Sequence, residues 1–407
     1  MALRVSSRPP AVSQAPPITE ALAAFHHEGQ ETHVEWDGEV PFFVNAFWTA
    51  RQRQTHALQQ VSYRACFKPQ LPAFFIERLT APGDLVHDPF MGRGTTPIQA
   101  ALMGRRAVGS DINPLSALMA RPRLFPPHLD EVAVRLAAID WSSPPPEPDD
   151  PLLVFYHPET LAQIRALRDH LLAREAESRL DRADDWIRMV AIGRLTGHSA
   201  GFFSVYSLPP NQAASLNSQR RINQRLGQAP PPRSVPALIL RKSAALLRQG
   251  APPAAAEARL LTAPADATFE IATASVDLVV TSPPFLDVID YAADNWLRTW
   301  FAGLDGVPPR MAHHHALKGW SDFVHGVFVE LARVVRPGGH VAFEVGEVRA
   351  GQVALEGLVL QALRGLPFEA LAVVVNRQAF TKTANCWGVG NNARGTNSNR
   401  IVLARRV

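Results

Sequence analysis

The tetrapeptide Ser282-Pro283-Pro284-Phe285 has side chains that suit the transfer of a group to an amine. It follows an apolar run at 276–280, so we expect it at the carboxyl end of a strand, where open α/β sheets place ligands. Two consecutive prolines cannot continue a central strand, and they fix the direction of the carbonyls before them. The Ser282 hydroxyl and the Pro283 carbonyl are then acceptors for an amine, and Phe285 is a flat surface for a base. An ordinary turn with a core phenylalanine explains the tetrapeptide alone equally well.

A glycine-rich turn lies upstream between two predicted strands, 85–88 and 106–110. Gly92 and Gly94 allow backbone N–H groups to approach a ligand closely. Asp111 stands after the second strand, at 111 − 92 = 19 positions beyond Gly92, where an acid hydrogen-bonds ribose hydroxyls. The pattern therefore predicts a nucleoside-binding βαβ unit.

Two further residues discriminate between nucleoside cofactors. Dinucleotide enzymes usually have a third glycine for close helix packing, and Pro97 occupies that place here. Asp88 precedes the loop, and a carboxylate there suits a ligand with a cationic amine. S-adenosylmethionine carries ribose, adenine and an ammonium group without a pyrophosphate, so the loop favours it over NAD.

The loop and the tetrapeptide together predict methyl transfer to an exocyclic amine of a base. A base inside a duplex cannot reach such a pocket, so base flipping is implied. Methylation at cytosine C5 needs a thiolate nucleophile, and it is disfavoured because neither Cys66 nor Cys386 follows a proline or lies in a suitable motif.

These motifs resemble those of the amino-group DNA methyltransferases, which act on cytosine N4 or adenine N6. The resemblance covers 60–120 and 260–407, with 88–96 as the first motif, 265–267 as the third and 63–69 as the segment that flanks the cofactor. A serine that opens the tetrapeptide is more usual for N4-cytosine enzymes of this family, and a restriction-modification role is expected. The resemblance assigns cofactor contacts to Phe67, Asp88, Phe90, Gly92, Gly94, Thr95, Thr96, Asp111, Ile112, Asp266 and Thr281.

The pattern of elements predicts a doubly wound, seven-stranded, Rossmann-like α/β sheet with an insertion. We expect an N-terminal extension at 1–60 that is loosely attached to about residue 35, a methyltransferase domain at 61–120 and 256–407, and an inserted target-recognition region at 121–255. The strands are predicted at 85–88, 106–110, 259–262, 276–280, 340–345, 371–375 and 401–404.

Charge is distributed unevenly along a chain whose formal net charge is only +4. The stretch 186–256 has nine basic residues and no acid, and the tail after Glu369 is also free of acids. Both stretches suit a polyanion such as double-stranded DNA, or they are neutralised by acids elsewhere in space. Within 207–242 we predict DNA contacts, because these side chains read base edges or hold phosphates, for Asn211, Gln219, Arg220, Arg221, Asn223, Arg225 and Arg233.

Three alternatives remain at this point: adenine N6 as the target, an RNA or protein-amide substrate, and a DNA-binding protein without catalysis. We expect a bacterial cytoplasmic enzyme, because the chain shows neither a signal peptide nor a transmembrane run. No metal is expected, since 313–315 is a histidine run without a plausible partner. A cognate restriction endonuclease is expected as a functional partner that need not bind this chain.

Overall fold

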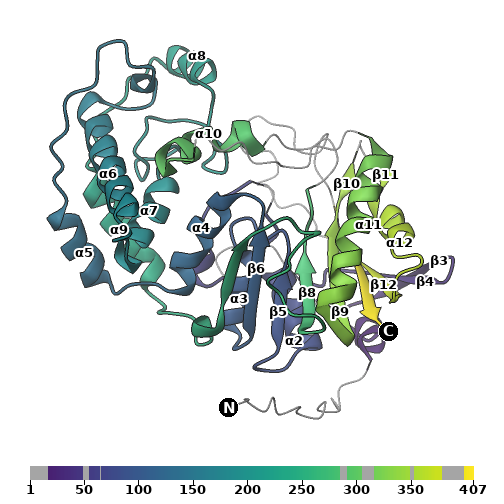
Figure 1. The fold of residues 1–407 in the computed structure, drawn as a ribbon. Helices are drawn as coiled ribbons and strands as arrows, with labels where there is room; N and C mark the ends of the chain where they lie inside the picture. The colour runs from purple at the N-terminus through teal and green to yellow at the C-terminus, as the bar shows by residue number, and fades with distance from the viewer. Residues whose placement is uncertain are drawn as a thin grey trace, which may run out of the picture.

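The computed structural model describes residues 17–48, 55–64, 66–284, 291–304, 316–348, 353–377 and 398–407. A nine-stranded sheet crosses the molecule in the order β3-β4-β12-β13-β9-β8-β5-β6-β7 (Figure 1). Its strands are β3 (His33–Asp37), β4 (Val40–Asn45), β5 (Leu85–Asp88), β6 (Arg106–Asp111), β7 (Arg259–Thr262), β8 (Val276–Thr281), β9 (Val335–Val345), β12 (Phe368–Arg377) and β13 (Ser398–Arg406).

The seven predicted strands are all present, and the doubly wound α/β fold is confirmed. From β5 the chain moves outward through β6 to β7, then returns to place β8 on the other side of β5. The strands from β7 to β9 run parallel to one another, and β13 runs antiparallel to both of its neighbours. The order reverses between β5 and β8, which is where sheets of this type bind ligands.

Helices cover both faces of the sheet. The face that carries Val279, Val341 and Phe343 packs on α11 (Leu317–Val334) and α12 (Leu355–Ala362). The opposite face carries Val280 and Ala342 and packs on α2 (Gln70–Leu79). The βαβ unit contains α3 (Thr95–Leu102), and the shorter elements are α1 (Ile18–Ala23), β1 (His26–His27), β2 (Gln30–Glu31), η2 (Ala57–Gln59), η4 (Ala255–Glu257), β10 (Glu347–Val348) and β11 (Val353–Ala354).

The N-terminal segment is more ordered than we predict from its sequence. Residues 17–48 form α1, two short hairpins and the edge of the large sheet, where β4 pairs in parallel with β12. Phe47 and Trp48 are buried against Phe74 of α2, with ring centroids 5.6 and 5.5 Å apart. Aromatic packing and main-chain pairing therefore hold this segment, and the prediction of a loose attachment to about residue 35 is wrong for 17–35.

The predicted insertion forms a helical layer beside the sheet (Figure 1). Buried side chains of α6, α7, α9 and the later helix α10 form one apolar cluster together with Ile98 and Met119. Helix α10 thus packs with the insertion, although our boundaries place its residues in the methyltransferase domain. The helices of this layer are α4 (Pro114–Leu124), α5 (Leu129–Ala138), η3 (Pro151–Val154), α6 (Pro158–Ala176), α7 (Arg182–Ile192), α8 (Leu216–Leu226), α9 (Val235–Leu247) and α10 (Tyr291–Ala302).

Candidate functional site

The glycine-rich loop and the tetrapeptide meet where the strand order reverses. Asp88 is the last residue of β5 and Thr281 is the last residue of β8. The Thr281 hydroxyl donates a hydrogen bond of 2.6 Å to Asp88 Oδ1, and the backbone N–H of Phe90 donates to the same oxygen at 3.0 Å. Asp88 Oδ2 is buried and has no hydrogen bond within the described residues. This oxygen is an acceptor that suits a cationic ligand group.

Burial gives the Asp88 carboxyl an unusual proton affinity. The side chain is 1% exposed, and burial raises its pKa to about 7, against the opposing effect of the hydrogen bonds from Thr281 and Phe90. The carboxyl of Asp111 lies near enough to raise the pKa further. A bound cation would reverse this effect, because it favours the carboxylate over the neutral acid.

Asp111 holds the loop at the end of the neighbouring strand. Its Oδ2 accepts a hydrogen bond of 2.9 Å from the backbone N–H of Gly92, and its Oδ1 accepts one of 2.8 Å from that of Asn113. Each carboxylate oxygen can accept a second hydrogen bond, so both remain usable by the hydroxyls of a ribose. Burial raises the pKa of this carboxyl as well.

Gly94 is required by both its conformation and its surroundings. It precedes α3 with a φ of +84°, and a Cβ there would lie 2.6 Å from the Cβ of Ala120 in α4. We expect Gly94→Ala to lower the free energy of unfolding by about 1 kcal/mol or more from strain and by about 1–3 kcal/mol from overlap. Denaturant unfolding measures the loss, and Gly104→Ala is the control, since Gly104 has a φ of +75° with nothing within 4 Å. Equal losses in the two variants would contradict the role of Ala120.

Two buried arginines attach the flanking segment to the loop. The guanidinium of Arg93 donates to the carbonyls of Val61 and Gln59, and the Gln59 side chain donates to the carbonyl of Thr95 at 3.0 Å. Arg123, which is fully buried in α4, donates to the carbonyl of Arg93. These positioning residues are not predicted from the sequence, because a buried arginine that bonds to carbonyls has no local sequence signature.

A cavity of about 400 Å³ lies between this flanking segment and the loop. Tyr63, Cys66 and Lys68 line it, as do Arg93 and the predicted DNA contact Asn211. Burial lowers the pKa of the Lys68 ammonium and raises that of the Cys66 thiol. The segment that resembles the cofactor-flanking motif therefore does line a hollow beside the loop, whereas the Cys66 thiolate is disfavoured.

The tetrapeptide begins directly at the end of β8. Pro283 is buried, and the carbonyl of Pro284 accepts a hydrogen bond of 3.0 Å from the indole of Trp320 in α11. Ser282 is partly exposed, and it lies beside Glu344 of the adjacent strand β9. Glu344 is not among the residues predicted from the sequence. The predicted Phe285 lies outside the described residues.

The helix that follows the tetrapeptide connects the flanking segment with the insertion. Asp294 of α10 accepts hydrogen bonds of 2.8 Å from the guanidinium of Arg64, and its backbone carbonyl accepts one of 2.9 Å from the N–H of Ala213. Arg64 also donates to the side chain of Gln212 at 2.6 Å. Three segments that are distant in the sequence therefore meet beside the site.

The remaining predicted cofactor residues differ in how they are presented. The hydroxyl of Thr96 donates to the carbonyl of Val280 at 3.0 Å, and that of Thr95 accepts a hydrogen bond from Arg93 at 3.1 Å. Together with Thr281, these buried threonines have protein partners, which makes them positioning residues for the loop. The others keep some exposed surface around the loop and the adjoining strand ends, namely Phe67, Phe90, Ile112 and Asp266.

Helix α8 contains most of the predicted DNA contacts, but two of them are committed to the interior. Gln219 is fully buried and donates to the carbonyl of Tyr206 at 2.9 Å and to Asn223 at 2.8 Å. Asn223 in turn donates to the carbonyl of Val154 at 2.7 Å. The amides of Gln219 and Asn223 thus hold the helix in place, and DNA contact by these two residues stays a prediction.

The arginines of the same helix are presented to solvent. Arg220, Arg221 and Arg225 are exposed, and no acidic partner of theirs occurs in the part of the chain that the structure describes. Figure 1 shows α8 at the end of the helical layer that also holds α10, the helix after the tetrapeptide. Arg233 is half-buried next to Thr160, to which its backbone is hydrogen-bonded at 2.7 Å.

The basic residues of the two acid-free stretches differ in how far acidic side chains neutralise them. In the tail, Arg400 pairs with Glu356 and Arg405 pairs with Glu369 at 2.6 Å, so acids elsewhere neutralise these cations. In the insertion Arg188 is buried and pairs with Glu175 at 3.0 Å. The other basic side chains of the insertion are the ones that suit a polyanion.

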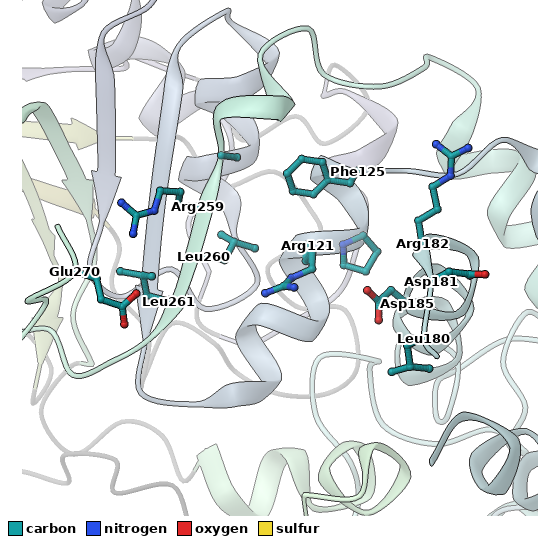
Figure 2. Close-up of a pocket in the computed structure, with 12 residues that line it drawn as sticks. Arg121, Phe125, Leu180, Asp181, Arg182, Asp185, Arg259, Leu260, Leu261 and Glu270 are labelled. Carbon is teal, nitrogen blue, oxygen red and sulfur yellow. The ribbon is translucent and has the colours of Figure 1, made fainter. Parts of the chain in front are cut away.

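A second hollow, of about 550 Å³, lies at the outer edge of the sheet (Figure 2). Arg121 of α4, Asp185 of α7 and Arg259 of the edge strand β7 contribute charges of both signs to its lining. None of the residues predicted for the cofactor, the chemistry or DNA lines it. We assign it no ligand.

Two kinds of feature are absent from the described ranges. No helix there has the length and apolarity needed to cross a bilayer. No group of three or more histidine, cysteine or acidic side chains there is arranged to hold a metal ion.

Comparisons with known proteins match a part of the chain. Residues 19–120 match the family model described as DNA methylase, of the N6/N4 type. The Type II methyltransferase M.MjaII of Methanocaldococcus jannaschii is 35% identical over 99 residues, which are 23% of this chain and 19% of that protein. The Type II methyltransferase M.MvaI of Kocuria varians is 31% identical over 83 residues, 20% of this chain and 18% of that protein. The matches thus span about a fifth of the length of these relatives.

Among solved structures, a putative DNA modification methylase from Thermus thermophilus aligns with 34% of this chain and 47% of its own, at 22% identity and a TM-score of 0.21. A geranyl diphosphate methyltransferase aligns with 84% of this chain and 78% of its own, at 11% identity and a TM-score of 0.36. At these TM-scores the two structures decide nothing about the function of this chain.

Proposed function

We propose that this chain, whose residues 19–120 match the DNA methylase family model, transfers a methyl group from S-adenosylmethionine to an exocyclic amine in duplex DNA, with cytosine N4 as the leading target. The observation that carries this proposal is the junction of the two motifs. Asp88 of the loop and Thr281 before the tetrapeptide are joined by a hydrogen bond of 2.6 Å at the reversal point of the sheet. A cofactor bound at the loop would therefore lie beside Ser282.

The residues at this junction have complementary roles. The buried, unpartnered Oδ2 of Asp88 would accept the ammonium group of S-adenosylmethionine, and Asp111 would accept its ribose hydroxyls. When bound, this cofactor supplies a methyl group on a positively charged sulfur. Ser282 and the Pro283 carbonyl would hold the amine of the flipped base in line with that methyl group, and Phe285 would stack on the base.

The choice of base rests on Ser282. A serine at the start of the tetrapeptide supports cytosine N4, whereas adenine N6 is the alternative with the same fold and cofactor. Burial raises the pKa of the Cys66 thiol, which supports direct transfer to an amine over attack on C5 by that thiolate. The relatives named as Type II methyltransferases support a restriction-modification role. A bacterial cytoplasm and a cognate endonuclease as a functional partner remain parts of the proposal.

The product of the reaction tests the proposal directly. The protein is incubated with S-adenosylmethionine and unmethylated genomic DNA, and the DNA is digested to nucleosides for mass spectrometry. N4-methylcytosine is the expected product. If N6-methyladenine formed instead, adenine would replace cytosine as the proposed target base. The proposed cofactor and the proposed role of the tetrapeptide would stand. Methylation of RNA or protein alone in parallel reactions would overturn the proposal.

The exposed arginines of α8 are proposed to hold DNA phosphates beside the flipped base. Replacing Arg220, Arg221 and Arg225 together with glutamine should weaken duplex binding and reduce the slope of log K against log salt by roughly 1 for each phosphate that the variant no longer binds. Affinity measured by fluorescence anisotropy at several salt concentrations checks this. Arg364→Gln, an exposed arginine after α12, is the matched control. A triple variant with the slope of the control would exclude α8 from the phosphate contacts.

A further inference from the structure

A buried carboxylate stands behind the tetrapeptide serine. Thr281 of β8 is in register with Phe343 of the parallel strand β9, so the next residues, Ser282 and Glu344, lie side by side. The Ser282 hydroxyl lies close enough to the Glu344 carboxylate to oppose the rise in the pKa of that carboxyl. On the other side, Glu344 is paired in register with Ile401 of β13, and Asn399 of that strand donates to Glu344 Oε1 at 2.5 Å.

The surroundings of Glu344 leave it few other functions. Its side chain is 5% exposed and faces the apolar side of the sheet that α2 covers, where Ala342 also lies. Burial raises the pKa of this carboxyl, and the hydrogen bonds from Ser282 and Asn399 oppose the rise. A buried carboxylate lowers the stability of the fold unless it is hydrogen-bonded. An apolar side chain at the same position would lower it less. Its presence therefore calls for an explanation beyond packing.

We propose that Glu344, held by Asn399, is a positioning residue that orients the Ser282 hydroxyl and receives its proton during methyl transfer. The inference rests on the proposed function of the chain. With its hydroxyl hydrogen directed to Glu344, Ser282 Oγ would turn its lone pairs to the incoming amine. A neutral serine would by itself be a weak hydrogen-bond acceptor. The negative charge of Glu344 next to it makes Ser282 Oγ a stronger acceptor.

The proton balance of the reaction gives the carboxylate a second task. The amine nitrogen forms its bond to the methyl carbon while the carbon–sulfur bond breaks and its electron pair stays on sulfur. The methylated nitrogen then carries a positive charge and one proton too many. That proton passes to Ser282 Oγ as the serine hydroxyl proton passes to the Glu344 carboxylate, which becomes a neutral acid. Release of this proton to water restores the site.

The test is a double-mutant cycle on the full-length protein. Single-turnover methylation of duplex DNA is measured for the wild type, Glu344→Gln, Ser282→Ala and the double variant, together with cofactor and DNA affinities. We expect Glu344→Gln to lower the rate by about tenfold to a hundredfold while both affinities stay within about twofold. The double variant should be no slower than Ser282→Ala alone, because Glu344 acts through Ser282.

A second buried glutamate separates this role from a structural one. Glu356 is 3% exposed and accepts a hydrogen bond from Arg400, so Glu356→Gln also breaks a buried interaction. We expect it to lower the unfolding midpoint without lowering the rate. Additive losses in the cycle, or a wild-type rate in Glu344→Gln, would overturn the relay while the proposed function stands. A wild type that binds the cofactor but methylates no duplex DNA overturns the proposed function and the relay with it.

Discussion

Replacing Ser282 with alanine should slow methyl transfer by about a hundredfold or more, because one oriented hydrogen-bond partner of the reacting group is removed. The affinity for S-adenosylmethionine should stay within about twofold, since the proposed cofactor contacts are Asp88 and Asp111, across the strand junction. Single-turnover rates and isothermal titration calorimetry measure the two quantities.

Ser275→Ala is the matched control for this change. Ser275 stands before the amino end of the same strand, β8, and its hydroxyl donates to the carbonyl of Ala272 at 2.6 Å. The control should keep the wild-type rate. If Ser282→Ala reduced the rate and the cofactor affinity by the same factor, Ser282 would belong to the cofactor site and not to the amine.

Replacing Asp88 with asparagine should weaken cofactor binding by about tenfold to a hundredfold, which corresponds to the loss of one charged hydrogen bond. The unliganded variant should not be less stable than the wild type at pH 8. In the wild type the pKa of Asp88 rises from 3.8 when unfolded to about 7 when folded, so its contribution to stability is lost as the pH rises through that interval. Asparagine has no charge to bury.

The same shift predicts a pH dependence of binding. A cationic ligand group favours the Asp88 carboxylate, so binding to the wild type should release a proton below a pH of about 7, and affinity should fall as the pH is lowered. The Asp88→Asn variant should lack this dependence. Calorimetry at pH 6 and pH 8 in buffers of different ionisation enthalpy measures both. Equal pH dependence in the two proteins would assign the titration to another group.

The sheet is predictable from the sequence because its strands are short apolar runs bounded by turn residues. The bounds of β5 and β7 agree with the prediction, and the parallel strands between β7 and β9 follow from the βαβ pattern. Helix α8 is not predictable in this way. It buries a polar amide, Gln219, where amphipathic helices bury apolar side chains, so its periodicity resembles that of a polar loop.

The residues of the candidate site also differ in whether the sequence predicts them. Asp88, Asp111 and Ser282 stand at strand ends next to characteristic turns, and local spacing is enough to find them. Glu344 lies beside Ser282, and Arg123 donates to the carbonyl of Arg93 in the loop, each from elsewhere in the sequence. Their roles depend on strand register and helix packing, which no local pattern encodes. A charged residue within the apolar run of β9 is the only local signal for Glu344, and Arg123 has none.

The pairing of β4 with β12 has a consequence for how the chain folds during synthesis. Asn376 of β12 holds Trp48, just after β4, through a hydrogen bond to its backbone N–H, across 328 positions of sequence. The βαβ unit of β5 and β6 forms from contacts that are close in the sequence, whereas β4 must wait until almost the whole chain has left the ribosome. Such distant pairing slows folding, and a strand edge without its partner is prone to aggregation. Expression of this protein should therefore depend on chaperones that shield the N-terminal strands, and hydrogen exchange should show β4 protected last.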